Sequence, residues 1–572
     1  MSNRYGVPVL VCGLLLLGVS PGGAGSTADG GPLAAMLPGG AEIVVYVPSL
    51  AGFDAAAAEI SAALDRPAFR HGDLFVQLMD GRAGTLFEHA DASGPLAVAI
   101  ELPDMATGRP QVVTAVFRTA LSSDGLAERV DTLAAATPYA YAIGDKGFVA
   151  VSTAPDRAPG SGLPALFMRM PEDNLSVRLD LAAILDAYGP MMELGLAAIP
   201  VSDRPGDDTS AVGDPTDPRF TSGQVAGLRK ILRGLVDAAV RFDMSFDVVG
   251  PELVVTSDLI VAAGSPLEAA PGRDISRALD LSRRLPPGAT FTYVGAGDFS
   301  GLLDLASDYY RESLMASAET SGAGEALAAE WFDTYLEVIA LLFEPYAANI
   351  AFSDESWTYV AVLESDDAAA TAAWLAGRLD ALPAEVLGLD LERQPARSIS
   401  GVEVHGWDVA VSDADGAGLL FDGMSGEPGR TTGPYRPADL LAHMPSTLRI
   451  GHRDGLLFCS IGGSTEDFAA LLEADGRAPD ERLASMARCG GDDSLSLIVG
   501  DLAPYLAWIA SLLPEAGSAS VRDAVPAGPI GVRSLVTAGG TCYGSRSVVA
   551  LDGLKALGSF IGTLGAPVAG SE

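Results

Sequence analysis

Three aspartates near the middle of the second half of the chain stand in a pattern that suits a hard cation. Asp413 and Asp415 belong to the run Asp-Ala-Asp-Gly, and Asp422 follows nearby. Carboxylates at alternate positions of a loop can surround Ca²⁺, but this run lacks a third alternating oxygen ligand and the closing Glu. Asp-Gly is equally typical of a hairpin turn after the strand-like stretch Val402–Val411. The sequence therefore predicts either a calcium site at Asp413, Asp415 and Asp422 or a plain turn.

Histidines offer one further candidate. The chain has five of them: His71, His89, His405, His443 and His452. No two have the i, i+4 spacing that places both rings on one helix face as metal ligands. His405 and Trp407 lie two residues apart on a strand-like stretch, which predicts that they line a pocket. The alternative is a partly exposed strand histidine with no binding role.

Two glycine patterns resemble catalytic or nucleotide-binding motifs but lack the secondary structure that these motifs need around them. Gly18–Gly22 fits Gly-x-Ser-x-Gly, but it lies in a leader and cannot form a strand-to-helix elbow. Gly295–Gly301 follows a strand-like run, yet its spacing is unusual and no parallel βαβ unit surrounds it. A tight turn is the expectation there. No Ser-His-Asp or Cys-His constellation emerges, so we expect no catalytic residues; paired carboxylates are the route left open for a hydrolase.

The elements around these residues recur along the chain. Leu37–Ala41 leads into the strand-like Glu42–Tyr46, and about 248 residues later Leu285–Ala289 leads into Thr290–Val294. Each strand is followed by an aromatic residue at a turn and then by a helical run. An opening motif, a strand and a helix therefore occur twice.

Further pairs of segments follow in the same order. They are Val112–Phe117 with Thr358–Leu363, and Asp173–Val177 with Asp493–Leu497. Two β-rich runs around Gly250 and Pro251, Arg241–Val249 and Glu252–Val261, predict a hairpin. Apolar residues at helical spacing predict helices within 128–133, 326–342 and 369–382. Hairpin-joined strands with helices elsewhere favour antiparallel sheets covered by helices. The sequence thus predicts an α+β fold made of two diverged tandem copies of one antiparallel-sheet-plus-helices unit.

Composition places the domain limits. We expect a signal peptide at 1–24 and a first copy at 25–262 that contains an acidic, Pro- and Gly-rich loop at 200–218. A linker is expected at 263–273, and the second copy at 274–572.

The charge balance limits the partners. The chain has 74 Asp and Glu against 36 Lys and Arg, a net charge of −38 at pH 7, and no basic run. Phosphate binding needs a basic stripe that releases counterions. Nucleic acid and an anionic membrane surface are therefore disfavoured as partners.

The N-terminus has the pattern of a secretory leader. Arg4 is its only charge and the apolar run Val7–Val19 follows. The small residues after this run predict cleavage after Ala24, with cleavage after Ser26 as the alternative. Acylation at Cys12 is disfavoured, because the bulky Val11 precedes it and most of the apolar run follows it. The expected location is the periplasm or the medium, with no integral membrane span after processing. Three cysteines remain there, Cys459, Cys489 and Cys542, and the first two could pair.

The opening Leu37–Ala41 with its strand, the leader and the duplicated layout resemble an uncharacterised family of exported bacterial proteins that carry a domain of unknown function. This resemblance implies no activity and no site residues. We expect a non-enzymatic exported protein that binds a small or apolar ligand, or that binds an envelope protein as an assembly factor or scaffold. The alternative is an envelope hydrolase that uses carboxylates or a bound divalent cation. No cofactor is expected beyond the calcium considered above.

Overall fold

The computed structural model describes most of the chain between residues 27 and 564. The described residues are 27–29, 33, 35–64, 66–79, 84–104, 107–108, 110–154, 169–171, 173–199, 222–268, 275–297, 300–321, 325–353, 356–381, 389–411, 443, 445–474, 478, 480–490, 494–512, 521–526 and 528–564. The expected leader and the expected loop at 200–218 lie outside them.

The chain forms two compact units, each assembled from separate segments. Unit 1 comprises Met1–Gly189, Ala238–Ala262 and Cys542–Lys555; unit 2 comprises Pro190–Asp237, Ala263–Thr541 and Ala556–Glu572. The chain enters unit 2 for the long central stretch after Ala262, where the expected linker 263–273 begins. Two exchanges were not expected from the sequence, since residues 190–237 join unit 2 and residues 542–555 return to unit 1.

Unit 1 is built on one antiparallel sheet. Its strand order is β5-β6-β4-β3-β2-β8-β9-β10-β20. The strands are β2 (Ile43–Val47), β3 (Leu96–Glu101), β4 (Val112–Arg118), β5 (Ala140–Ile143), β6 (Phe148–Ser152), β8 (Leu175–Asp180), β9 (Ala239–Val249), β10 (Glu252–Val261) and β20 (Cys542–Ala550). The predicted hairpin of Arg241–Val249 and Glu252–Val261 is confirmed by β9 and β10. A separate pair joins β1 (Thr27–Asp29) to β7 (Arg169–Pro171).

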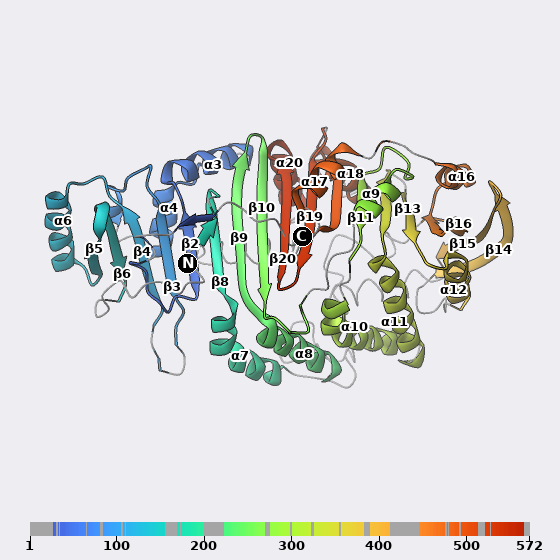
Figure 1. Ribbon diagram of the computed structural model, residues 1–572, viewed down its shortest axis with the longest axis horizontal. Helices are drawn as coiled ribbons and strands as arrows, with labels where there is room; N and C mark the ends of the chain where they lie inside the picture. The colour runs from blue at the N-terminus through green and yellow to red at the C-terminus, as the bar shows by residue number, and fades with distance from the viewer. Residues whose placement is uncertain are drawn as a thin grey trace, which may run out of the picture. The chain divides into compact units, whose positions relative to one another are not determined.

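Side-chain alternation gives this sheet two buried faces. Leu96 and Val98 of β3 pack in one apolar cluster with four helices, whereas Ala97 and Ala99 pack on the other face with residues such as Leu37. The helices are α3 (Leu50–Ala63), α4 (His71–Met79), α5 (Gly84–Phe87) and α6 (Ser123–Ala136), and a 3₁₀ turn spans Asp145–Gly147. Figure 1 shows these helices beside the blue and cyan strands.

Unit 2 has its own antiparallel sheet. Its strand order is β19-β18-β11-β12-β13-β17-β16-β15-β14. The strands are β11 (Phe291–Gly295), β12 (Tyr346–Phe352), β13 (Trp357–Glu364), β14 (Leu389–Ile399), β15 (Val402–Val411), β16 (Thr447–Arg453), β17 (Leu456–Ile461), β18 (Ser494–Asp501) and β19 (Gly531–Gly539).

Helices cover both faces of this second sheet. One apolar cluster joins α9, α16 and α17 to it, and another joins α12 to the opposite face. A third cluster packs α18 against the C-terminal part of α20. Their bounds are α9 (Ile275–Ser282), α12 (Ala368–Asp380), α16 (Thr465–Glu473), α17 (Glu481–Gly490), α18 (Leu502–Ser511) and α20 (Leu551–Leu564). The fold is therefore α+β, as the sequence predicted.

Four longer helices stand at the ends of the strands in Figure 1. They are α7 (Leu181–Ala198), α8 (Ser222–Ala238), α10 (Ser300–Ser321) and α11 (Glu325–Ala340), the last continued by a 3₁₀ turn at Leu341–Phe343. By length and apolar composition alone, α7 is the one helix of the described residues that could cross a membrane. Only 11% of it is buried.

Candidate functional site

A pocket of about 580 Å³ lies between α8 and α10 of unit 2. Its apolar lining includes Ala226 of α8, Leu305 of α10, and Pro266 and Leu267 from the stretch expected to be a linker. Leu267 is only 1% exposed, so this stretch is anchored in the unit. The volume falls in the range of small-molecule sites, which are mostly apolar with a few polar groups.

Glycines bring the walls of this pocket together. A Cβ at Gly227 of α8 would lie 2.6 Å from the Cα of Tyr309, and one at Gly301 would lie 2.5 Å from the carbonyl oxygen of Pro266. Real Cβ atoms do not approach other atoms this closely. The two helices and the 266–267 stretch can reach these positions because glycine has no side chain there.

Three cations of α8 line the same pocket. Arg229, Lys230 and Arg233 stand at i, i+1 and i+4, a spacing that groups them on one side of the helix. The Lys230 Nζ lies 2.7 Å from Asp308, and the Arg233 Nε lies 2.8 Å from Glu193. Among the described residues no ion pair or hydrogen bond holds the guanidinium of Arg229.

The ion pair on Arg233 fixes the charge of its partner. The hydrogen bond from Arg233 lowers the pKa of Glu193, and the same bond raises the pKa of Arg233. Both side chains therefore stay ionised around neutral pH, and their charges offset each other. Arg229 remains as the half-buried cation of the pocket that is available to an anionic group.

The described lining of the pocket combines apolar side chains with a few charged ones. Among the described residues that line it, Asp304 is the only acid, and none is Ser, Cys or His. No group of three or more His, Cys, Asp or Glu that could hold a metal occurs in the part of the chain that the structure describes. An apolar chamber with a free arginine suits an anion that carries an apolar body.

Unit 1 contains a buried charge cluster on the β8–β9–β10 part of its sheet. Arg178 of β8 donates to both carboxylate oxygens of Asp243, at 2.6 and 2.8 Å, and Arg241 lies 3.1 Å from the same carboxylate. Asp258 of β10 stands directly opposite Asp243 in register. Burial, with the charge of Asp243 as a smaller cause, raises the pKa of Asp258 to about 7. Asp258 therefore holds its proton up to near neutral pH, next to the ion pair of Arg178 and Asp243.

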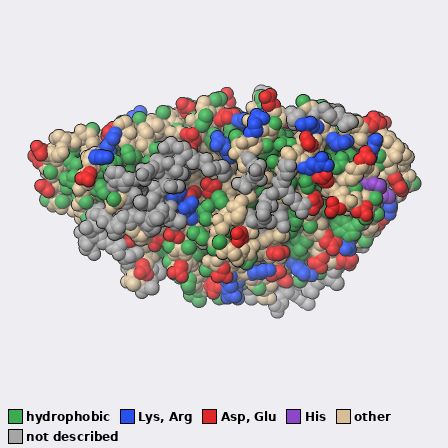
Figure 2. Space-filling model, viewed as in Figure 1, with side chains coloured by type: hydrophobic (Ala, Val, Ile, Leu, Met, Phe, Trp, Pro, Cys, Tyr) green, Lys and Arg blue, Asp and Glu red, His purple; other side chains and the backbone are tan. Residues whose placement is uncertain are grey.

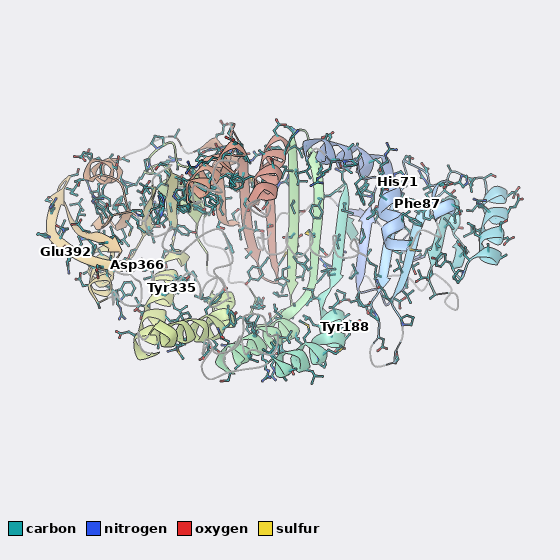
Figure 3. The ribbon with its side chains drawn as sticks, turned by 180° about the vertical axis from the view of Figure 1, so that it is seen from behind. His71, Phe87, Tyr188, Tyr335, Asp366 and Glu392 are labelled. Atoms are coloured by element: carbon teal, nitrogen blue, oxygen red, sulfur yellow. The ribbon has the colours of Figure 1, made fainter. Side chains whose placement is uncertain are left out.

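A His–Asp pair lies elsewhere in unit 1. The Nδ1 of His71, at the start of α4, is 2.7 Å from the Oδ2 of Asp54 on α3, and the ring packs edge-on against Phe87 at 5.5 Å. Figure 3 labels His71 beside Phe87. Within the described ranges no serine, threonine or cysteine hydrogen-bonds to this ring. The pair has the orienting acid and the base of a hydrolytic triad but no nucleophile.

His405 and Trp407 share one face of β15 in unit 2. Trp407 is 1% exposed, donates from Nε1 to Asp380 at 2.9 Å, and borders a small pocket of about 160 Å³. His405 is not part of that lining, and its Nδ1 lies 3.3 Å from Arg393. Trp407 is primarily a core residue here. A binding role for the two residues stays a prediction.

The remaining predicted residues are placed as follows. Asp413, Asp415 and Asp422 lie outside the described residues. Cys459 and Cys489 form no disulfide in the structure, and neither does Cys542, so the suggested pairing is absent. Burial raises the pKa of the Cys459 thiol to about 12, which makes it unreactive.

The sequence reasoning missed both the pocket and the charge cluster. One signal for the cluster was present, because Arg241, Asp243 and Ser245 alternate with Phe242 and Met244 on a strand whose other face is apolar. The pocket had only a weak signal, three cations within five residues of a chain with 74 acids and 36 bases. Comparison of the chain with protein-family models, with curated proteins and with solved structures finds no match.

Proposed function

We propose that the chain is an exported, non-enzymatic binding protein whose pocket between α8 and α10 takes a small, partly apolar molecule with one anionic group. The observation that carries this proposal is the position of Arg229, a half-buried cation that makes no ion pair or hydrogen bond among the described residues and adds only a minor electrostatic attraction to Glu193, in an apolar chamber of about 580 Å³. Export rests on the leader, with the periplasm or the medium as the location. An assembly or scaffold role toward an envelope protein remains the other form of this non-enzymatic proposal.

A matched series of eight-carbon probes tests the pocket. We expect octanoate to bind more tightly than 1-octanol, and octylamine to bind weakest, because the anion gains a charge-assisted bond to Arg229. Arg229→Gln should lower the octanoate affinity about tenfold and leave 1-octanol unchanged. Isothermal titration calorimetry of the mature protein measures all three.

Arg453→Gln is the control for this series, since Arg453 is a half-exposed arginine of unit 2 outside the pocket. Equal loss of octanoate in both variants, or no preference for the anion in the parent, contradicts the proposal. Native mass spectrometry of the purified protein adds a second test, because a natural ligand appears as an added mass of a few hundred daltons that Arg229→Gln reduces.

We further infer that the two units are diverged tandem copies. The strand series β9-β8-β2-β3-β4-β6-β5 has the same chain connectivity as β19-β18-β11-β12-β13-β17-β16, with β14 and β15 as an insertion. β10 and β20 follow the equivalent strands β9 and β19.

Local contacts support the same correspondence. The amide of Asp180 donates to the carbonyl of Glu42 at 2.8 Å, and the amide of Asp501 donates to the carbonyl of Thr290 at 2.8 Å. Each aspartate also accepts a bond from the first turn of the next helix, at 2.9 and 3.0 Å. Unrelated sheets have no reason to share these details.

The buried faces agree as well. Ala115 and Phe117 of β4 pack on one face and Val116 on the other; Ala361, Leu363 and Val362 of β13 divide in the same way.

The carboxylate hydrolase is the second candidate, and Asp258 favours it. A carboxyl that titrates near 7 can act as a general acid or base, and Asp243 supplies a second carboxyl group beside it. Turnover of generic ester, glycoside or peptide substrates that Asp258→Asn abolishes would establish this alternative over the binding proposal.

A further inference from the structure

Exposed apolar side chains concentrate on α7, α8, α10 and α11, of which α8 and α10 line the pocket. Of the eleven large hydrophobic residues that are most exposed among the described residues, seven lie on α7, α8, α10 and α11, so their distribution over the surface is uneven. They are Met191, Met192, Leu194, Val236, Tyr310, Tyr335 and Val338. Figure 2 shows hydrophobic side chains among charged ones over this part of the surface.

The densest group is the C-terminal end of α7, residues 190–198, which we call the α7 tip. Leu194 is 70% exposed, and Met191 and Met192 are 46% and 47% exposed. No residue of the α7 tip is buried. Transfer of such a surface from water into an apolar environment lowers the free energy.

The α7 tip carries a single charged side chain, and that charge is already neutralised. Glu193 lies 2.8 Å from the Nε of Arg233, and this bond lowers the pKa of Glu193. An ion pair enters a low-dielectric boundary at a smaller free-energy penalty than a lone carboxylate does. The α7 tip therefore presents a surface that is both apolar and electrically neutral.

The first half of α7 is fixed to unit 1, which excludes a membrane span. Asp180 caps its first turn through a 2.9 Å bond to the Ala183 amide, Tyr188 donates to the carbonyl of Pro103, and Gly189 is buried. Figure 3 labels Tyr188 on this helix. A span of the hydrocarbon core needs about 20 apolar residues. The nine residues of the α7 tip can instead lie in the interface, where apolar side chains enter about 5–10 Å.

We propose that the α7 tip docks onto the surface of a zwitterionic lipid bilayer. Charge determines which lipids the chain can approach. The net charge of −38 is repelled by anionic lipids, whereas zwitterionic lipids do not repel the neutral α7 tip. Methionine side chains adapt to an irregular apolar surface such as acyl chains. Tyr310 of α10 and Tyr335 of α11 are also exposed, and tyrosine favours the interfacial layer.

The pocket-lining Arg233 is the partner of Glu193, but an anion bound at Arg229 is not needed for this docking, because Arg229 makes only a minor electrostatic contribution at Glu193. Vesicle flotation tests it on the full mature chain. We expect the parent to float with phosphatidylcholine–phosphatidylethanolamine vesicles, and added phosphatidylglycerol to weaken flotation at low salt. Leu194→Glu should lower the partition coefficient tenfold or more, since it replaces the most exposed apolar side chain by a charge. Arg229→Gln should float like the parent.

Val249→Glu is the matched control. Val249 is 52% exposed at the β9–β10 turn of unit 1, so this variant adds the same charge outside the α7 tip. Equal losses in Leu194→Glu and Val249→Glu, absence of flotation in the parent, or flotation that requires phosphatidylglycerol each overturn the proposal.

Leu194→Trp separates the bilayer from other occupants. We expect the emission of the introduced tryptophan, obtained as the difference from the parent, to shift to shorter wavelength only when vesicles are added. A blue-shifted emission without vesicles that depends on protein concentration shows that a second copy covers the α7 tip. A blue shift that is independent of concentration shows that the chain covers its own α7 tip. Both results overturn the proposal.

Discussion

Buried charges define the β8–β9–β10 region of unit 1 at the residue scale. Arg178 and Asp243 are 5% and 7% exposed. The two hydrogen bonds between their side chains replace hydrogen bonds that water would make to these groups in the unfolded chain. No arginine forms a bidentate bond to Asp258 among the described residues. The buried carboxyl therefore avoids an uncompensated charge by keeping its proton. Burial penalises the charged form, and this raises the pKa of Asp258 to about 7.

Asp258 therefore couples the stability of unit 1 to pH. The native state holds the proton up to about pH 7, whereas the unfolded chain releases it near the usual value of about 4, so the native state binds more protons between these limits. The contribution of Asp258 to the free energy of unfolding should be largest below pH 4, should fall as pH rises toward 7, and should be level above it. The change is about 1.4 kcal/mol per unit of pKa difference.

Asp258→Asn should remove this dependence and should make unit 1 more stable than the parent at pH 8. The five tryptophans, Trp331, Trp357, Trp374, Trp407 and Trp508, all belong to unit 2, so their fluorescence does not report on unit 1. Hydrogen exchange of β9 peptides at pH 5 and pH 8 measures the effect. Asp131→Asn, on the exposed side of α6, serves as control, and an equal response of the two variants contradicts the assignment.

Close packing of two helices shapes the pocket at the scale of elements. Gly223, Gly227 and Gly234 lie on the side of α8 that meets α10, where Glu312, Tyr309 and Leu305 stand opposite them. Ion pairs continue the contact, from Lys230 to Asp308. The pocket exists because the helices approach closely along this line and diverge beside it.

Gly227→Ala should destabilise unit 2 by about 1–3 kcal/mol. The new Cβ would lie 2.6 Å from the backbone of Tyr309, and a helix backbone cannot yield as a flexible side chain does. Gly377→Ala is the control in the interior of α12, where nothing lies within 4 Å of the added Cβ. The control should gain about 0.5–1 kcal/mol from helix propensity. Urea unfolding followed by tryptophan fluorescence reports on both, and opposite signs are the expected result.

A strand from the end of the chain completes unit 1 at the scale of the whole molecule. β20 pairs with β10 over nine residues, from Glu252 opposite Ala550 to Ile260 opposite Cys542. The hydroxyls of Ser257 and Ser545, 288 residues apart, lie 3.2 Å from each other across this pair. Unit 1 therefore cannot reach its full sheet until the last strand has been made.

A disulfide tests this pairing directly. Ser257→Cys with Ser545→Cys, in a Cys542→Ser background, should form an intramolecular disulfide on oxidation, because facing side chains of paired strands lie within bonding range. Peptide mapping without reductant identifies the bond. Thr256→Cys with Ser545→Cys places the thiols on opposite faces of the sheet and should stay reduced. A bond in the second variant but not in the first would contradict the register.

Local patterns determined much of the secondary structure. The two β-rich runs at 241–249 and 252–261, separated by Gly250 and Pro251, predicted β9 and β10 to within two residues, because β-branched and aromatic side chains favour a pleated, half-buried strand. Apolar spacing likewise placed helices within 128–133, 326–342 and 369–382, where α6, α11 and α12 lie. Composition and charge also narrowed the classes of partner, since they depend on the residues alone.

Tertiary structure alone decided the site. Arg229 and Leu305 are 76 positions apart in the sequence, and Arg178 and Asp243 are 65 apart, so no local period brings them together. The exposure of the α7 tip was equally hidden, because an apolar helix in a sequence predicts burial and only the packing of its neighbours leaves Leu194 in water. Periodicity reports which side of an element is apolar. Which long-range partner covers that side depends on contacts between distant segments, and those contacts placed the pocket, the charge cluster and the α7 tip.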